Sequence, residues 1–158
     1  MEIKRDNAKV LQTLKNRFEA LASVQGKTGW FEVSKYDDGT PVASVAAQNE
    51  FGDPEKNIPA RPTMRPAAIE KKNELNQVTA QAAKQVIAGK ITAKDAMDRI
   101  TYLMENAIAK NITALTSPPL SPVTIEIRKS KGNTSTKPLI DSGKMLQQLS
   151  SIVEDANT

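Results

Sequence analysis

The sequence predicts an α+β fold within a single domain. Two long helical patterns follow each other between residues 64 and 112, and an amphipathic helical pattern opens the chain. Short β-prone runs lie near residues 30–33 and 149–153. At 158 residues the chain has the usual length of one domain. Aromatic residues make up only 4% of it, so the core must be built mainly from Leu, Ile, Val, Ala and Met.

The first segment, residues 1–25, predicts an N-terminal helix. From Ile3 to about Ala22, apolar residues recur every three or four positions, which is the spacing of one helical face. The basic residues of this segment fall largely on the remaining faces. We therefore expect an amphipathic helix that packs on the core and turns its charged side to water.

Residues 26–63 predict a strand, a short helix and a proline-rich loop. The β-prone run at 30–33 is the best strand candidate, and Asp37-Asp38-Gly39 supplies a turn. A short helix is expected to begin at Pro41, with Thr40 as its N-cap, and to end at Gly52. Three prolines then make residues 53–63 an extended or turning loop.

Residues 64–116 predict a pair of helices. An apolar stripe with helical spacing runs from Met64 to about Ala88, and Gly89 is a typical stop. Thr92 and Asp95 then form the pattern of a capping box, and helical spacing continues to residue 112. Two long helices joined by so short a turn favour an αα-hairpin.

Residues 117–158 predict a loop, short helices and a C-terminal strand. The run VTIEI alternates as a strand does, but Ser121 followed by Pro122 is equally a helix start, so periodicity leaves residues 122–128 open. Residues 129–137 have the composition of a mobile loop. Asp141 or Ser142 can cap a short helix, and the run near residue 150 suggests a final strand.

The composition removes most classes of enzyme. The chain has no Cys and no His, which excludes disulfides, thiolate or imidazole metal sites and every triad that needs an imidazole base. Glu50, Asp53 and Glu55 lie close together, but they lack the spacing of a calcium loop and nothing marks a cleft, so we expect neither an acid/base pair nor a cation site there. No glycine-rich phosphate loop is present. We expect no catalysis, no cofactor and no metal.

The net charge of +4 permits contact with nucleic acid, but Lys and Arg are scattered along the chain. The first residues lack the apolar core of a signal peptide, and no window approaches the roughly 18 apolar residues of a membrane span. We expect a protein that is made and folds in the cytoplasm and has no membrane contact.

Four strings in a fixed order suggest a family. They are GWFEVSKYDDGTPVASVAAQNEFG, NIPARPTMRPA, PPLSPVTIEIRKSKG after the helical pair, and KPLIDSGKM. Their order, with the helical pair between them, resembles the neck and tail-completion proteins of tailed bacteriophages. The resemblance runs from about residue 26 to 147, which is most of the chain. The residues that match are Glu50, Phe51 and Gly52; Ile58, Pro59, Arg61, Pro62 and Arg65; and Pro138, Leu139, Ile140, Asp141 and Gly143.

Two positions depart from the family pattern. Thr63 stands where the family usually has an aromatic residue, which could loosen packing under the loop, and Ser142 stands where it usually has Thr. The resemblance also favours a helix over a strand for residues 122–128.

The resemblance implies a structural virion protein with an α+β fold, in which a small antiparallel sheet is flanked by long helices. Such proteins are not enzymes. They form homo-oligomeric rings, often six-fold, at the head–tail joint, where they contact other neck and tail proteins and meet passing DNA only through sequence-independent charge. The location implied is the virion, after assembly in the bacterial host cytoplasm. The alternatives are a tail terminator of similar size and symmetry, and a stand-alone nucleic-acid-binding module.

Residues 50–65, here called the bracket, gain a physical interpretation from this resemblance. Its prolines 54, 59 and 62 stiffen the connection, so that it loses less entropy on ordering. We expect Arg61 and Arg65 to pair with carboxylates, Glu50 among them, and to fix the angle at which the following long helix leaves.

Overall fold

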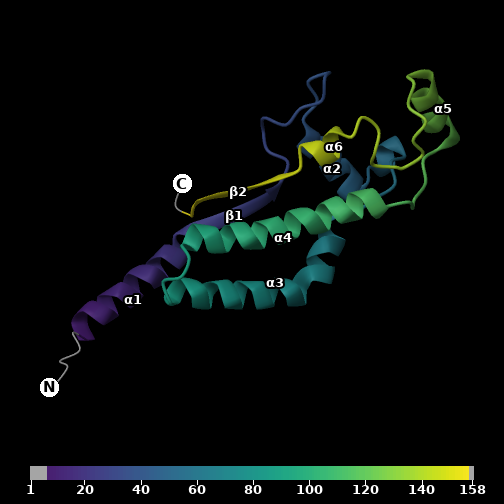
Figure 1. Ribbon diagram of the computed structural model, residues 1–158. Helices are drawn as coiled ribbons and strands as arrows, with labels where there is room; N and C mark the ends of the chain where they lie inside the picture. The colour runs from purple at the N-terminus through teal and green to yellow at the C-terminus, as the bar shows by residue number, and fades with distance from the viewer. Residues whose placement is uncertain (1–6, 157–158) are drawn as a thin grey trace.

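The computed structural model describes residues 7–156 and confirms an α+β fold. In chain order it contains α1 (Asn7–Ala22), β1 (Val24–Gly29), α2 (Val42–Phe51), the 3-10 helix η1 (Pro54–Lys56), α3 (Met64–Ile87), α4 (Ala93–Ala114), α5 (Pro122–Ser130), α6 (Lys144–Gln147) and β2 (Ser150–Asp155). The molecule is elongated, with α1 at one end and α5 at the other (Figure 1).

The two strands form a small antiparallel sheet that lies along α4. Val24 pairs with Asp155 and Gly29 with Ser150. α4 packs against both strands, and α3 runs back along α4 as the second arm of the predicted hairpin (Figure 1). Gly26 allows this close approach, because a Cβ atom there would lie 2.3 Å from the Cγ2 atom of Thr101. The sheet is therefore held at a distance that only glycine permits at this position.

The core consists of two apolar clusters. The larger lies where α2, α3 and α4 meet the C-terminal segment, and the smaller lies at the turn between α3 and α4. The buried members are Val42, Ala46, Ala67, Ala107, Ile108, Ile112, Leu139, Met145 and Leu149 in the larger, and Ala82, Val86, Ala93 and Ala96 in the smaller. This agrees with the aliphatic core that the composition predicts.

The predicted strand at residues 30–33 is wrong. The strand lies immediately before it, at residues 24–29, and Val33 is 90% exposed. Trp30 instead anchors a loop, because its indole Nε1 donates to the carbonyl of Met145 at 2.6 Å. The sequence VQGKTG has little β-propensity of its own, so its pairing with β2 and its packing on α4 decide its conformation.

Several predicted helix ends are confirmed and others move by one or two residues. Thr92 and Asp95 form the predicted capping box, and Gly52 ends α2 with a φ of 76°. α2 begins at Val42, with Pro41 in place of Thr40 at the N-cap. At α6 the N-cap is Gly143, one or two residues beyond the two predicted candidates.

The C-terminal third contains the helix that the resemblance favours. α5 covers residues 122–130, and the hydroxyl of Ser121 accepts from the backbone N–H of Thr124 at 3.2 Å. The predicted loop at 129–137 therefore starts after Ser130. β2 confirms the final strand.

The prediction that the N-terminal helix packs its apolar face on the core is wrong for most of its length. α1 has no buried residue, and Val10, Leu11 and Phe18 are 55%, 66% and 55% exposed. The helix ends at Ala22 as predicted. However, β1 begins at Val24, within residues 1–25, the segment predicted to hold the N-terminal helix. Residues 3–6 of the predicted helix lie outside the described residues.

Candidate functional site

The Glu50 carboxylate, which comes from the last turn of α2, caps the N-terminus of α3. Its side chain accepts from three consecutive backbone N–H groups, those of Thr63 at 2.6 Å, Met64 at 2.9 Å and Arg65 at 3.0 Å. The first N–H groups of a helix have no acceptor within the helix itself. Thr63 is the N-cap residue, but its own side chain makes no capping hydrogen bond. Glu50 thus replaces a local cap with one from another helix and joins α2 to α3.

Arg65 closes the same contact from the α3 side. Its Nε donates to Oε1 of Glu50 at 3.1 Å, and its Nη2 donates to the Glu50 carbonyl at 2.6 Å. The guanidinium also lies 5.0 Å from the centre of the Phe51 ring, within the range of a cation–π interaction. The predicted pairing of Arg65 with Glu50 is confirmed, and Phe51 gains a role beside it.

The pKa of Glu50 lies below its ordinary value of 4.5. Burial raises it, since the residue is only 4% exposed. The hydrogen bonds from the N–H groups of Met64, Arg65 and Thr63 and from the Arg65 side chain outweigh that effect, because they stabilise the charged form. The carboxylate is therefore ionised and engaged at neutral pH.

Gly52 lets the loop turn back onto the end of α2. Its φ of 76° lies in the left-handed region, and a Cβ atom would lie 2.9 Å from the backbone nitrogen of Ala60. The backbone N–H of Arg61 then donates to the carbonyl of Asn49 at 2.5 Å. Asp53 and Ile58 form an isolated bridge across the turn. The loop between α2 and α3 is thus compact and is closed by main-chain hydrogen bonds.

Arg61 does not pair with a carboxylate, and that expectation is wrong. Its Nε donates to the carbonyl of Pro118 and its Nη2 to the carbonyl of Pro119, both at 2.8 Å. The side chain is 7% exposed. Burial lowers the pKa of the Arg61 guanidinium, and the nearby charge of Arg128 lowers it further. Arg61 therefore fastens the bracket to the segment that follows α4.

Arg128, in the last turn of α5, holds the segment around Pro138 and Leu139 in the same way, and this role was not predicted. Its Nη1 donates to the carbonyls of Ser135, Lys137 and Ile140 at 3.3, 2.8 and 3.1 Å, and its Nη2 donates to Pro138 at 3.1 Å. Its Nε lies 3.5 Å from a carboxylate oxygen of Asp141. Within its run of basic residues, nothing in the sequence distinguishes Arg128 from the exposed lysines beside it.

The two motif regions meet at one place in the molecule. A groove of about 980 Å³ is lined by Phe51, Gly52, Ile58, Pro59 and Arg61 from the bracket, together with Pro119, Leu120 and Pro138. Leu139 lies in the core at 7% exposure, and Gly143 is the N-cap of α6 with a φ of 77°. Pro62 is half-buried. Pro138 of the second stretch thus meets the bracket in this groove, and Leu139, Asp141 and Gly143 line a neighbouring pocket together with Val45 and Asn49 of α2.

This region contains hydrogen bonds and ion pairs that hold segments together. Among residues 7–156, no group of three or more Asp and Glu side chains is placed to hold a metal ion. The carboxylates Asp53 and Glu55 do not join Glu50: Asp53 pairs with Lys56 at 2.9 Å, and Glu55 is exposed. In the same part of the chain, no helix is long and apolar enough to cross a bilayer.

Comparison with protein-family models, with curated proteins and with solved structures finds no match.

Proposed function

We propose that this chain is a structural protein of the neck of a tailed bacteriophage, a tail-completion component that forms a homo-oligomeric ring at the head–tail joint. The observation that carries the proposal is the meeting of the two motif stretches beside α2, at the groove that borders the α2–α3 junction. There Glu50, Arg61 and Arg65 are occupied with main-chain atoms of neighbouring segments. Such an arrangement fixes the relative positions of helices, which is what a subunit of a rigid ring requires.

The exposed surface supports an assembly. The chain exposes 10699 Å², whereas a compact monomer of 17.2 kDa exposes about 7,800 Å². The difference is about 2,900 Å², and one partner in a specific protein–protein interface buries about 800 Å². A ring subunit has two neighbours, so surface of this extent suits it.

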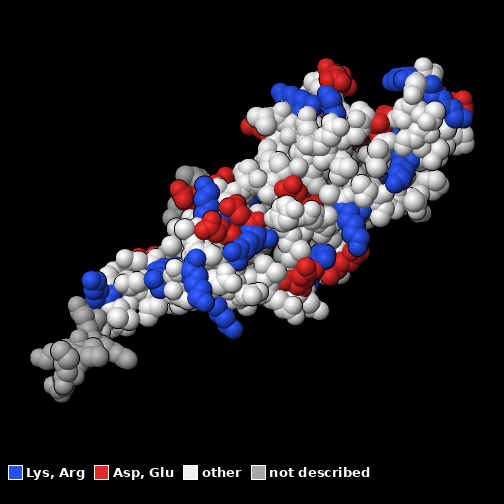
Figure 2. Space-filling model, viewed as in Figure 1, with Lys and Arg blue, Asp and Glu red and all other residues white. Residues whose placement is uncertain are grey.

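The charge distribution gives little support to a stand-alone nucleic-acid-binding module. In the view of Figure 2, Lys and Arg are interleaved with Asp and Glu along the molecule and do not form one continuous basic patch. Lys27, Lys56, Lys71, Lys129 and Lys144 are each paired with a carboxylate. Phosphate binding depends on cations free to replace counterions.

Deleting the coding gene from the phage genome that carries it tests the proposal. The lysate should then contain filled heads and unattached tails in electron micrographs, and the wild-type chain supplied in trans should restore complete particles. Normal numbers of joined particles without this chain would overturn the proposal. Locating the chain in a map of the complete particle separates a neck position from the end of the tail that a terminator occupies.

A further inference from the structure

Helix α1 leaves the body of the molecule with its apolar stripe uncovered. Its last turns are anchored: Arg17 Nη1 donates to the Ile87 carbonyl at 2.6 Å, and Ala20 and Leu21 pack on the smaller core cluster. The earlier turns extend away from the α3–α4 hairpin (Figure 1). Leu11 and Phe18 remain more than half exposed there. An apolar stripe of this kind is normally covered by another surface.

The open stripe has the geometry of a socket. Leu11, Leu14, Lys15 and Phe18 stand at positions i, i+3, i+4 and i+7, which are the four corners of a hole that accepts one side chain from a facing helix. Three corners are apolar, and the fourth is a lysine whose side chain is 67% exposed and whose Nζ lies 3.7 Å from a carboxylate oxygen of Glu19 on the same helix, a contact that solvent screens. The socket therefore suits a large, partly apolar side chain with negative charge beside it.

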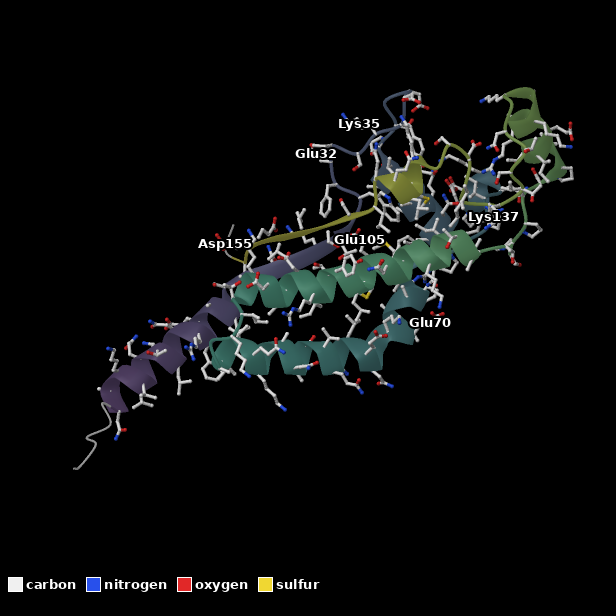
Figure 3. All side chains as sticks on the ribbon, viewed as in Figure 1. Glu32, Lys35, Glu70, Glu105, Lys137 and Asp155 are labelled. Carbon is white, nitrogen blue, oxygen red and sulfur yellow. The ribbon has the colours of Figure 1, made fainter. Side chains whose placement is uncertain are left out.

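The outer face of α4 offers that combination. Asp98, Tyr102 and Glu105 stand at i, i+4 and i+7, with Tyr102 67% exposed, along a shallow valley of about 450 Å³ beside Ser151 of β2. Arg99 also lines the valley, and its Nη1 donates to Gln85 of α3 at 2.8 Å, which leaves the two carboxylates to set the charge around Tyr102. Figure 3 shows Glu105 on α4 near the middle of the molecule, well away from α1. The same chain's α1 points away from this face, so only another chain can bring the two together.

We propose that the α1 socket of one copy receives Tyr102 of a second copy, with Lys15 beside Asp98 and Glu105 of that copy. The occupant is a second copy because this chain carries both the socket and the Tyr102 face, which match in charge and in apolar character. In addition, the accessible surface of the chain exceeds that of a compact monomer by more than the roughly 800 Å² that one partner buries in an interface. The contact is heterologous, because the socket and Tyr102, the knob that enters it, lie on different surfaces. Repeating such a contact gives a closed ring when the rotation from one copy to the next closes, as the proposed ring requires. The inference rests on the proposed ring and identifies the surface that forms it.

Two single variants test the contact, and a third serves as a matched control. Leu11→Glu blocks the socket and Tyr102→Glu removes the knob, while Val123→Glu places the same charge on α5 at 68% exposure, close to the 66% and 67% of the other two sites. Light scattering should find wild type and Val123→Glu in rings. Leu11→Glu and Tyr102→Glu alone should be monomeric, with self-association at least about 30-fold weaker, as for loss of a central interface residue. Circular dichroism should show unchanged helix content in all four chains.

Mixing the two blocked variants gives the decisive result. Tyr102→Glu keeps an intact socket and Leu11→Glu keeps an intact knob, so an equimolar mixture should form a 1:1 heterodimer that grows no further. Rings formed by either variant alone would overturn this contact and leave the proposed function standing. Dimers of Tyr102→Glu alone would overturn it in favour of pairing between two α1 helices. A wild-type chain that stays monomeric would overturn both the contact and the ring.

Discussion

Individual buried residues, two in the bracket and one in α5, hold segments of the molecule together through main-chain atoms. Glu50, Arg61 and Arg128 are 4%, 7% and 8% exposed, and each is engaged with backbone donors or acceptors of another segment. A buried charge is expensive unless its hydrogen-bonding capacity is used. Removing one of these side chains therefore leaves backbone groups without their hydrogen-bond partners and also disconnects two segments.

Replacing Glu50 with Gln should lower the free energy of unfolding by about 2 kcal/mol at neutral pH, because three N–H groups lose a charged acceptor. Denaturant unfolding measures the change. Glu55→Gln is the control: Glu55 is exposed, so its replacement should change stability by less than about 0.5 kcal/mol. Equal effects of the two substitutions would contradict the capping role.

The cost of the Glu50 substitution should depend on pH. The pKa of Glu50 is lowered from 4.5 in the folded chain, so its contribution is fully present above that value and is lost as pH falls through the folded pKa. The stability difference between wild type and Glu50→Gln should therefore be smaller at about pH 3 than at about pH 7. A difference that stays constant across this range would show that the charge of Glu50 is not what stabilises the α3 terminus.

Arg61→Lys should destabilise the chain by about 1 to 3 kcal/mol, because an ammonium group cannot reproduce the two-pronged donation to the carbonyls of Pro118 and Pro119. Arg61→Ala should lower the Tm and the yield of assembled particles as well. Arg99→Lys, at an exposed arginine with one hydrogen bond to Gln85, should leave the Tm nearly unchanged. An unchanged Tm and a normal particle yield for Arg61→Ala would count against the bracket.

At the scale of elements, the turns between helices depend on specific backbone conformations. Gly52→Ala should cost more stability than Gly39→Ala, although both glycines have positive φ. A Cβ atom at Gly52 meets backbone atoms of Ala60 and Ile58 at 2.9 and 3.0 Å, whereas nothing lies within 4 Å of one at Gly39. The conformational penalty alone is about 1 kcal/mol. The difference in Tm between the two variants therefore measures the loss of stability that comes from the steric clash at Gly52. Equal Tm values would show that the loop between α2 and α3 can shift to avoid the clash.

The helical elements could be predicted because their signals are local. The Thr92–Asp95 capping box and the stop at Gly52 are read from neighbouring residues, and both are confirmed. β1 could not be found, because VQGKTG becomes a strand through pairing with residues more than 120 positions away. The exposure of α1 was also missed, since an amphipathic pattern indicates that a face will be covered but not by which chain.

The bracket could be predicted in part. The pairing of Arg65 with Glu50 follows from a basic residue at the start of a helix beside a nearby carboxylate, and it is confirmed. The partners of Arg61 and Arg128 are backbone carbonyls, which every residue carries, so no sequence pattern marks them. Their burial depends on how distant segments cross, which local spacing does not encode.

At the scale of the whole molecule, the shape suits a subunit of an assembly. The hairpin and sheet form a long body, α1 extends from one end, and α5 lies at the other (Figure 1). The exposed apolar residues are distributed among these parts: Leu11 and Phe18 on α1, Tyr102 on α4 and Val123 on α5. A bracket that fixes the angle between α2 and α3 would keep such surfaces in constant relation from one copy to the next.

The mass of the purified wild-type chain, measured by native mass spectrometry, tests the central claim most directly. We expect a closed assembly, with a six-fold ring at six times 17.2 kDa, about 103 kDa. Negative-stain images of the same sample should show rings with a central opening. A single species of 17.2 kDa at every concentration measured would contradict the account.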